Sequence, residues 1–164
     1  GPPDQKGTGF TLTGQGLLVD IKQNKMSILS QIETEKVIDN KNFNLKSNFA
    51  EFSNKSHEAL FSGDVKMNLG KSYVEAPKAY FKYSSVTKSL ENILVQNGVK
   101  LFEENKKATS AELDIDLIED KMTLRGQPRV QQGEDEIRGQ EIVFLDGGKK
   151  VKINKVNIQG GAKK

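Results

Sequence analysis

Few residues of this 164-residue chain have the types and spacing that catalysis requires. His57, the only histidine, lies in the polar stretch NKSHEA, where a surface position explains it better than a catalytic role. Asp114 and Asp116 share one face of the strand-like run AELDIDL, a spacing that could hold a cation or serve a glycosidase. The outer, wetted face of a strand explains them better, and the acidic run at 134–136 is best explained as a charged hairpin loop.

The other reactive groups are missing or uninformative. Cysteine is absent, which excludes thiol catalysis, disulfides and zinc–thiolate sites. No phosphate-binding loop is visible, and combining the lone histidine with any Ser and Asp into a triad would be arbitrary. We therefore expect no enzymatic activity, no metal and no cofactor.

Composition indicates one domain with a large wetted surface. Only 35% of the residues are hydrophobic, 29% are charged, and the mean hydropathy is -0.59, which favours an elongated or open shape. The net charge of +3 comes from mixed signs, so we expect no nucleic-acid partner.

The sequence contains no apolar run long enough to predict a membrane span. Gly1-Pro2 has the form of a protease scar, so we expect a native signal peptide or anchor to have been removed.

Hydrophobic residues alternate with polar ones along most of the chain. In residues 111–117, Ala, Leu, Ile and Leu point one way while Glu, Asp and Asp point the other. Turn signals, Gln96-Asn97-Gly98 among them, recur at roughly 8–15 residues, which predicts an all-β fold. Residues 84–94 also show helical spacing, and a short helix there is the less favoured interpretation.

Small residues recur at a fixed distance within the chain. Each of three glycines is followed 13 residues later by a small residue: Gly63 by Ala76, Gly98 by Ala111, and Gly126 by Gly139. We interpret each unit as a Gly, a strand, a turn, and a small residue that opens the next strand. Coincidence among small residues is the alternative. A structural repeat of this kind buries its apolar face by stacking on its neighbours.

These units resemble a known family. The segments FSGDVKMNLGKSYVEAPKAYFKY, NGVKLFEENKKATSAELDIDL and MTLRGQPRVQQGEDEIRGQEIVFL are similar to repeats of the LptA/OstA family, over about residues 43–158. Residues 7–32 are similar to the closing strands of LptC-type domains. The resemblance leaves LptA-like, LptC-like and fused arrangements open.

The resemblance implies an elongated antiparallel β-jelly roll, V-shaped and built of stacked strands. Its members are periplasmic and non-catalytic, carry lipopolysaccharide between the inner and outer membranes, and assemble end to end through edge strands. It thus implies lipopolysaccharide (lipid A) as ligand, and other Lpt jelly-roll proteins or a second copy as partners. We expect a flexible segment at 1–9, one domain at 10–160 with LptC-like closing strands at 10–42, and a flexible tail at 161–164.

The apolar residues of the alternating pattern are candidates for the lining of a lipid groove. Burial of each acyl-chain methylene against them would contribute about 0.8 kcal/mol to lipid binding. Packing of a dry core is the alternative for any single position. The predicted lipid-groove residues are Val65, Met67, Leu69, Phe81, Val99, Leu101, Leu113, Ile115, Met122, Leu124, Ile142 and Phe144.

Strands at the two ends could join neighbouring molecules. The lysines in residues 149–158 either protect an edge strand from pairing or belong to a strand that pairs with a partner, and we favour pairing. Residues 26–32 form another candidate edge strand. Basic side chains near the rim could meet lipid phosphates or could simply be solvated. They are Lys66, Lys71, Lys78, Lys82, Arg125 and Arg129. The competing hypothesis of another class is a structural β-repeat scaffold with a closed core and no lipid ligand.

Overall fold

The computed structural model describes residues 11–13, 17–20, 25–38 and 41–155. The expectations for residues 1–9, for the tail at 161–164, and for Val156 and Ile158 lie outside this part of the chain. The search for membrane-spanning helices, made over the described residues, found none that is long and apolar enough.

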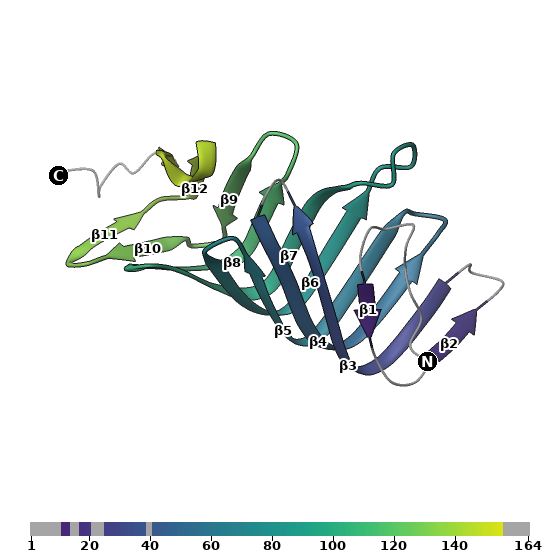
Figure 1. The fold of residues 1–164 in the computed structure, drawn as a ribbon. Helices are drawn as coiled ribbons and strands as arrows, with labels where there is room; N and C mark the ends of the chain where they lie inside the picture. Colours follow the sequence, from purple (N-terminus) through teal and green to yellow (C-terminus); the bar gives the residue numbers. More distant parts are fainter. Residues whose placement is uncertain (1–10, 14–16, 21–24, 39–40, 156–164) are drawn as a thin grey trace.

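The described residues confirm the all-β antiparallel fold (Figure 1). Thirteen strands form one open sheet in which consecutive long strands are neighbours, in the order β1-β3-β4-β5-β6-β7-β8-β9-β12-β13. β2 pairs with β3, and the hairpin of β10 and β11 pairs with β8. One short 3-10 helix, η2 (Asp146–Gly148), precedes the last strand. The strands are β1 (Thr11–Thr13), β2 (Leu17–Asp20), β3 (Lys25–Ile38), β4 (Lys41–Ser53), β5 (Glu58–Leu69), β6 (Ser72–Tyr83), β7 (Leu90–Glu103), β8 (Lys106–Asp116), β9 (Lys121–Arg125), β10 (Arg129–Gln132), β11 (Asp135–Arg138), β12 (Glu141–Leu145) and β13 (Lys150–Asn154).

A row of bulges crosses the sheet and folds it in two. The register shifts once in the middle of each long pairing, on β3 between Leu29 and Ile32, on β5 at residues 63–64, and on β7 at residues 97–98. The same row continues at residues 126–128, which separate β9 from β10 where both pair with β8. Because an extra residue bends its strand, aligned bulges produce a continuous crease.

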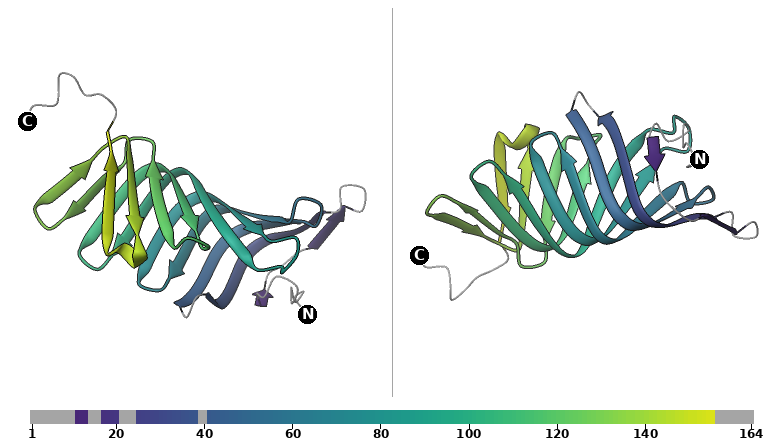
Figure 2. Two further views of the ribbon diagram at one scale, coloured as in Figure 1. Left: turned by 90° about the horizontal axis from the view of Figure 1, so that it is seen from above. Right: turned by 60° about the horizontal axis from the view of Figure 1, so that its bottom comes forward.

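The crease divides the sheet into two facing halves, seen as the curved trough of Figure 2. We call them wing A and wing B. Wing A comprises residues 32–38, 41–46, 65–69, 72–76, 99–103 and 106–110 with β1, β10 and β11. Wing B comprises residues 25–29, 49–53, 58–62, 78–83, 90–96 and 112–116 with β2, β9, β12 and β13.

Glycines make the crease possible because their backbone enters the left-handed region. Gly63, Gly98 and Gly126 have φ of 82°, 97° and 85°. At each site a sequence neighbour also has positive φ, namely Asp64, Asn97 and Gln127. Gly126 is the most confined, since a Cβ at that position would overlap the Cβ of Ala111 on β8. A side chain is therefore excluded here by both backbone conformation and space.

The 13-residue spacing is real, but its interpretation as glycines that open strands is wrong. Gly63, Gly98, Ala76 and Ala111 lie inside long strands, and only Gly126 and Gly139 fall between strands. Each unit leaves the crease, runs to the tip of wing A, turns, and returns to the crease on the next strand. The constant spacing thus measures one wing A hairpin, while wing B hairpins vary in length.

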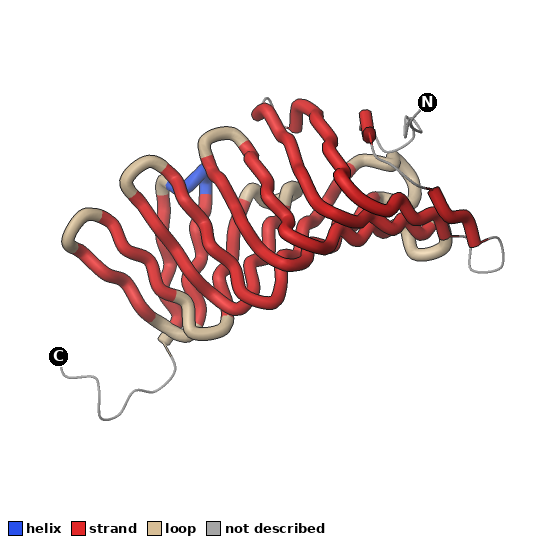
Figure 3. Tube along the Cα trace, turned by 90° about the horizontal axis from the view of Figure 1, so that it is seen from below, coloured by secondary structure: helices blue, strands red, loops and turns tan. Residues whose placement is uncertain are grey.

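The turns alternate between the tips of the two wings, as the loops in Figure 3 show. Gln96-Asn97-Gly98 is therefore not a turn but the bulge of β7, because Asn and Gly adopt positive φ equally well at both kinds of site. The link from β6 to β7 is instead the turn at residues 84–89, and β7 begins at Leu90, so residues 84–94 contain no helix.

Aromatic side chains fill the interior between the wings. Phe43 of wing A packs edge-on against Phe81 of wing B, with ring centroids 5.7 Å apart. Phe61 packs against the same ring at 4.8 Å. All three side chains are buried, so the middle of the molecule is a dry core.

The N-terminal strands belong to the same sheet. β2 pairs with residues 25–28 of β3, and β1 pairs with residues 33–35. The expectation of an edge at residues 26–32 is therefore wrong for its first part, because local alternation cannot reveal that shorter strands cover a longer one.

We expect Gly126→Ala to destabilise the protein more than Gly133→Ala. Gly133 also has positive φ (60°), but a Cβ there would meet nothing within 4 Å. In the Gly133 variant, the strained backbone should lower the free energy of unfolding by about 1 kcal/mol. In the Gly126 variant, the overlap with Ala111 adds to this strain, and the total loss should be at least about 2 kcal/mol. Urea denaturation measures both, and equal losses would contradict the steric role of the crease.

Candidate functional site

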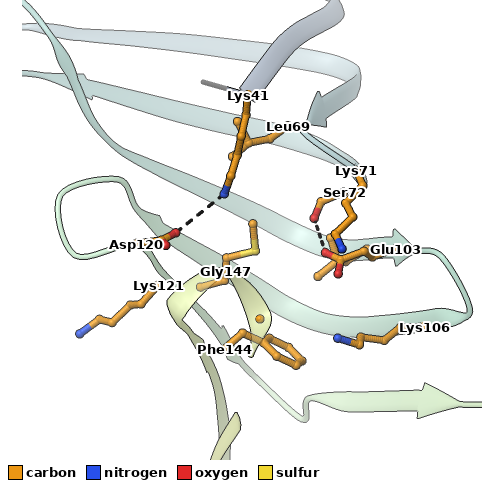
Figure 4. Close-up of a pocket in the computed structure, with 13 residues that line it drawn as sticks. Lys41, Leu69, Lys71, Ser72, Glu103, Lys106, Asp120, Lys121, Phe144 and Gly147 are labelled. Atoms are coloured by element: carbon orange, nitrogen blue, oxygen red, sulfur yellow. Dashed lines mark hydrogen bonds and ion pairs between the residues drawn. The ribbon is translucent and has the colours of Figure 1, made fainter. Parts of the chain in front are cut away.

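A pocket opens on the inner face between the tips of the two wings (Figure 4). It contains about 730 Å³ of empty space, part of which is open to solvent. Wing A contributes the ends of the β4–β8 hairpins, and wing B contributes the turn before β9, the end of β12, and η2. We call it the rim pocket. It is lined by Lys41, Leu69, Lys71, Ser72, Leu101, Glu103, Lys106, Asp120, Lys121, Met122, Phe144, Gly147 and Gly148.

A second, smaller opening of about 300 Å³ adjoins the rim pocket. The two share Lys41, Leu69, Asp120, Lys121 and Met122. Ile115 and Leu117 extend the apolar lining on the far side of this shared group. The two pockets are therefore neighbours between the wing tips.

Two contacts cross the mouth of the rim pocket. Lys41 Nζ of wing A lies 3.9 Å from Asp120 Oδ1, in the turn that leads into β9 (Figure 4). Lys106 Nζ lies 4.8 Å from the ring centroid of Phe144 on β12. Within wing A, Ser72 Oγ donates to Glu103 Oε1 at 2.6 Å. The floor is apolar and its mouth is charged, an arrangement suited to an amphiphile.

The twelve predicted lipid-groove residues all face the interior, but they divide into two groups. Eleven are buried and Met122 is partly buried. Leu69, Leu101, Met122 and Phe144 line the rim pocket, and Ile115 lines the adjoining one. The other seven line neither of these two pockets and pack in the core: Val65, Met67, Phe81, Val99, Leu113, Leu124 and Ile142.

Most of the predicted basic residues lie elsewhere. Of the six, only Lys71 lines the rim pocket. Lys66, Lys78 and Lys82 alternate with buried neighbours and so point to the outer face. Arg129 pairs with Glu136 on the β10–β11 hairpin, at 3.6 Å.

Arg125 instead organises the outer face of wing B. Its Nε donates to Glu141 Oε2 at 2.9 Å, and its Nη1 lies 3.5 Å from Asp114 and 3.7 Å from Glu112. The hydrogen bond to Glu141 raises the pKa of Arg125, and the same bond lowers the pKa of the Glu141 carboxyl. Arg125 thus ties β8, β9 and β12 together.

The acidic candidates have structural partners. Asp114 accepts a hydrogen bond from Asn92 at 2.7 Å. Asp116 accepts from the backbone N–H groups of Ile118 and Glu119, both at 2.9 Å, and so shapes the turn before β9. In the part of the chain that the structure describes, no group of three or more His, Cys, Asp or Glu residues could hold a metal ion.

The last strand continues the inner apolar face beyond the pocket. Val151 and Ile153 of β13 pair with Phe144 and Ile142, so they share the inner face with them. They are 44% and 38% exposed, and among the described residues β13 is the last strand of the sheet path.

Sequence reasoning missed Lys41 and Lys106 as functional candidates. Each is the first residue of a strand, Lys41 of β4 and Lys106 of β8, and nothing in the immediate sequence distinguishes either from the other lysines. Their proximity to Asp120 and Phe144 arises only when the two wings face each other.

Comparison with known proteins gives one family and one fold. Residues 44–146 match the family described as LptA/(LptD N-terminal domain) LPS transport protein. Among solved structures, the chain is similar to LptH from Pseudomonas aeruginosa, the LptA-homologous periplasmic component of the lipopolysaccharide transport device. The TM-score is 0.61 at 16% identity, and the alignment covers 74% of this chain and 88% of that one. The search of curated proteins found no match.

We expect Arg125→Gln to lower the free energy of unfolding at neutral pH by about 1 kcal/mol, because the partners are partly exposed and screened by solvent. Since the pKa of folded Glu141 is lowered, its contribution is present above the unfolded value near ~4.3. The contribution disappears as pH falls through the folded pKa, so the two proteins should converge toward acid pH. Urea titrations at several pH values test this. Lys66→Gln is the control, and a pH-independent difference would refute the explanation.

Proposed function

The chain belongs to the LptA and LptD N-terminal domain family of lipopolysaccharide transport proteins, and we propose that it works in the periplasm as a lipopolysaccharide carrier. On this proposal the acyl chains of lipid A contact the apolar floor of the rim pocket. A row of such molecules then bridges the inner and outer membranes. The observation that carries the proposal is an apolar pocket that opens between the two wing tips, beside a packed core.

The binding mode is passive. Leu69, Leu101, Met122 and Phe144 offer an apolar floor, and each methylene removed from water contributes about 0.8 kcal/mol. Binding of this kind needs no catalytic group. The energy for directional movement comes from elsewhere in the transport machinery.

The β13 edge is the candidate joint between successive molecules. Val151 and Ile153 extend the inner apolar face to β13, the last strand of the sheet path in the described part of the chain, and an edge of this kind suits strand addition. A strand added there, from a second copy or from another Lpt jelly-roll protein, would cover both side chains and continue the trough.

The competing candidate is a scaffold with a closed core and no lipid ligand. The aromatic packing of Phe43, Phe61 and Phe81 favours it, because this part of the interior is filled by its own side chains. The two candidates differ in whether substitutions in the rim pocket alter lipopolysaccharide binding.

We expect Met122→Glu to weaken binding of lipopolysaccharide by at least about tenfold, since it places a charge among acyl chains. Met122 is partly buried and lines both pockets, so the fold should tolerate the change. Ile118→Glu is the matched control, because Ile118 is 71% exposed at a turn. Anisotropy of fluorescent lipopolysaccharide measures both. Absence of saturable binding by the wild type, or equal affinities in the two variants, would support the scaffold instead.

We expect the double variant Val151→Lys, Ile153→Lys to abolish end-to-end oligomers, because charged side chains on an edge oppose strand addition. The matched control is Val86→Lys, Ile118→Lys, which alters two exposed apolar residues in turns. Light scattering over a concentration series gives the mass of each protein. A wild type that stays monomeric, or oligomers that survive the β13 substitutions, would exclude this edge as the joint.

A further inference from the structure

The Lys41–Asp120 ion pair spans the opening between the two wings. Both residues line the rim pocket and also the adjoining smaller one, so the pair lies where the two pockets meet. Lys41 is the first residue of β4 in wing A, and Asp120 belongs to the turn before β9 in wing B. Their contact therefore joins two segments that are otherwise attached only through the sheet.

The pair is weak and accessible. The two charged atoms are 3.9 Å apart, and the side chains are 42% and 60% exposed. Exposed ion pairs at such distances contribute little to the stability of the fold, so another charged group can replace either partner at low cost. The side chain of Lys41 nevertheless packs beside Gly70, since a Cβ added to Gly70 would lie 3.3 Å from the Cδ atom of Lys41. This contact restricts the directions in which the Lys41 side chain can point.

The charges around the mouth favour an anion. Lys41, Lys71 and Lys106 surround the opening, and Lys121 lines it with its amine pointing away in Figure 4. Lys71 is held by Glu104 at 3.6 Å, outside short hydrogen-bond range. Glu103 and Asp120 are the two acids in the lining. A phosphate would offer these lysines shorter, charge-assisted hydrogen bonds.

We infer that the Lys41–Asp120 pair is a latch across the rim pocket, opened by an amphiphile that carries a phosphate group and a hydrocarbon chain. The phosphate binds the Lys41 amine in place of Asp120, and the wing tips then separate. The hydrocarbon chain of the ligand enters between Leu69 and Met122. This inference rests on the proposed lipid-carrier function and adds to it a headgroup preference and a gate.

The chemistry is tested with two probes that share a twelve-carbon chain, dodecyl phosphate and dodecyl maltoside, used below their micelle concentrations in calorimetric titrations. We expect the wild type to prefer the phosphate, and high salt to reduce that preference. Asp120→Asn should strengthen binding of dodecyl phosphate by about threefold, because Lys41 is released. Lys41→Gln should weaken it by about threefold, because the phosphate loses its partner.

Opposite signs with the phosphate exclude a purely structural contact, and the neutral probe distinguishes a latch from a local charge effect. Both substitutions break the same ion pair, so a purely structural role predicts the same direction for both. With neutral dodecyl maltoside, the latch predicts that both variants bind somewhat more tightly, since both open the mouth. Lys66→Gln and Asp135→Asn repeat the charge changes at exposed positions away from the pocket and should alter neither affinity.

A wild type without headgroup preference, or variants that shift phosphate binding in the same direction, would overturn the inference. Fluorescent lipopolysaccharide is titrated in parallel, so that the lipid-carrier function is judged separately. Lipopolysaccharide binding without any binding of the single-chain probes would overturn the latch and leave the carrier function standing. Loss of binding to all three ligands would overturn both.

Discussion

A single continuous sheet can face itself only if each long strand bends at the same level, and this requirement shapes the whole molecule. Bulges on alternate strands, at 63–64, 97–98 and 126–128, supply the bend through residues with positive φ. The intervening strands adapt in a complementary way. Ser47 on β4 and Ser110 on β8 are buried at the crease, and each donates to the carbonyl two residues ahead, at 3.0 and 2.8 Å. Hydroxyl groups thus help to satisfy a backbone whose regular pairing is interrupted.

The crease brings the two wings face to face, and the interior between them is filled in one part and open in another. Phe43 on β4 and Phe81 on β6 lie toward the wing tips, and their rings meet across the gap. Beside the turn before β9 and the end of β12, the facing side chains leave the rim pocket. Among the described residues, Lys41 reaches Asp120 and Lys106 lies over Phe144 at this opening. An apolar pocket and its charged mouth therefore depend on the fold of the sheet along the crease.

An open sheet also leaves an edge, and here the edge has a consequence for function. β13 presents Val151 and Ile153 on the inner face, partly exposed, and is the last strand of the sheet path in the described part of the chain. On the outer face, Arg125 contacts carboxylates of β8 and β12. The proposed addition of a strand at β13 would cover the two apolar side chains while these outer contacts stay in place.

The sequence by itself determined the all-β fold and the inner face of each strand, because alternation with period two is a local property. All twelve predicted inward residues face the interior for this reason. It also contained the 13-residue spacing, although not its structural meaning. Glycine occurs in turns and in bulges alike, so the sequence predicts a turn at 96–98 where the structure has a bulge. Only the tertiary structure decided which inward residues line a pocket, and it brought Lys41 to Asp120 and Lys106 to Phe144. Contacts across the mouth join residues far apart in the chain, and their proximity depends on the angle at the crease, which no local pattern encodes.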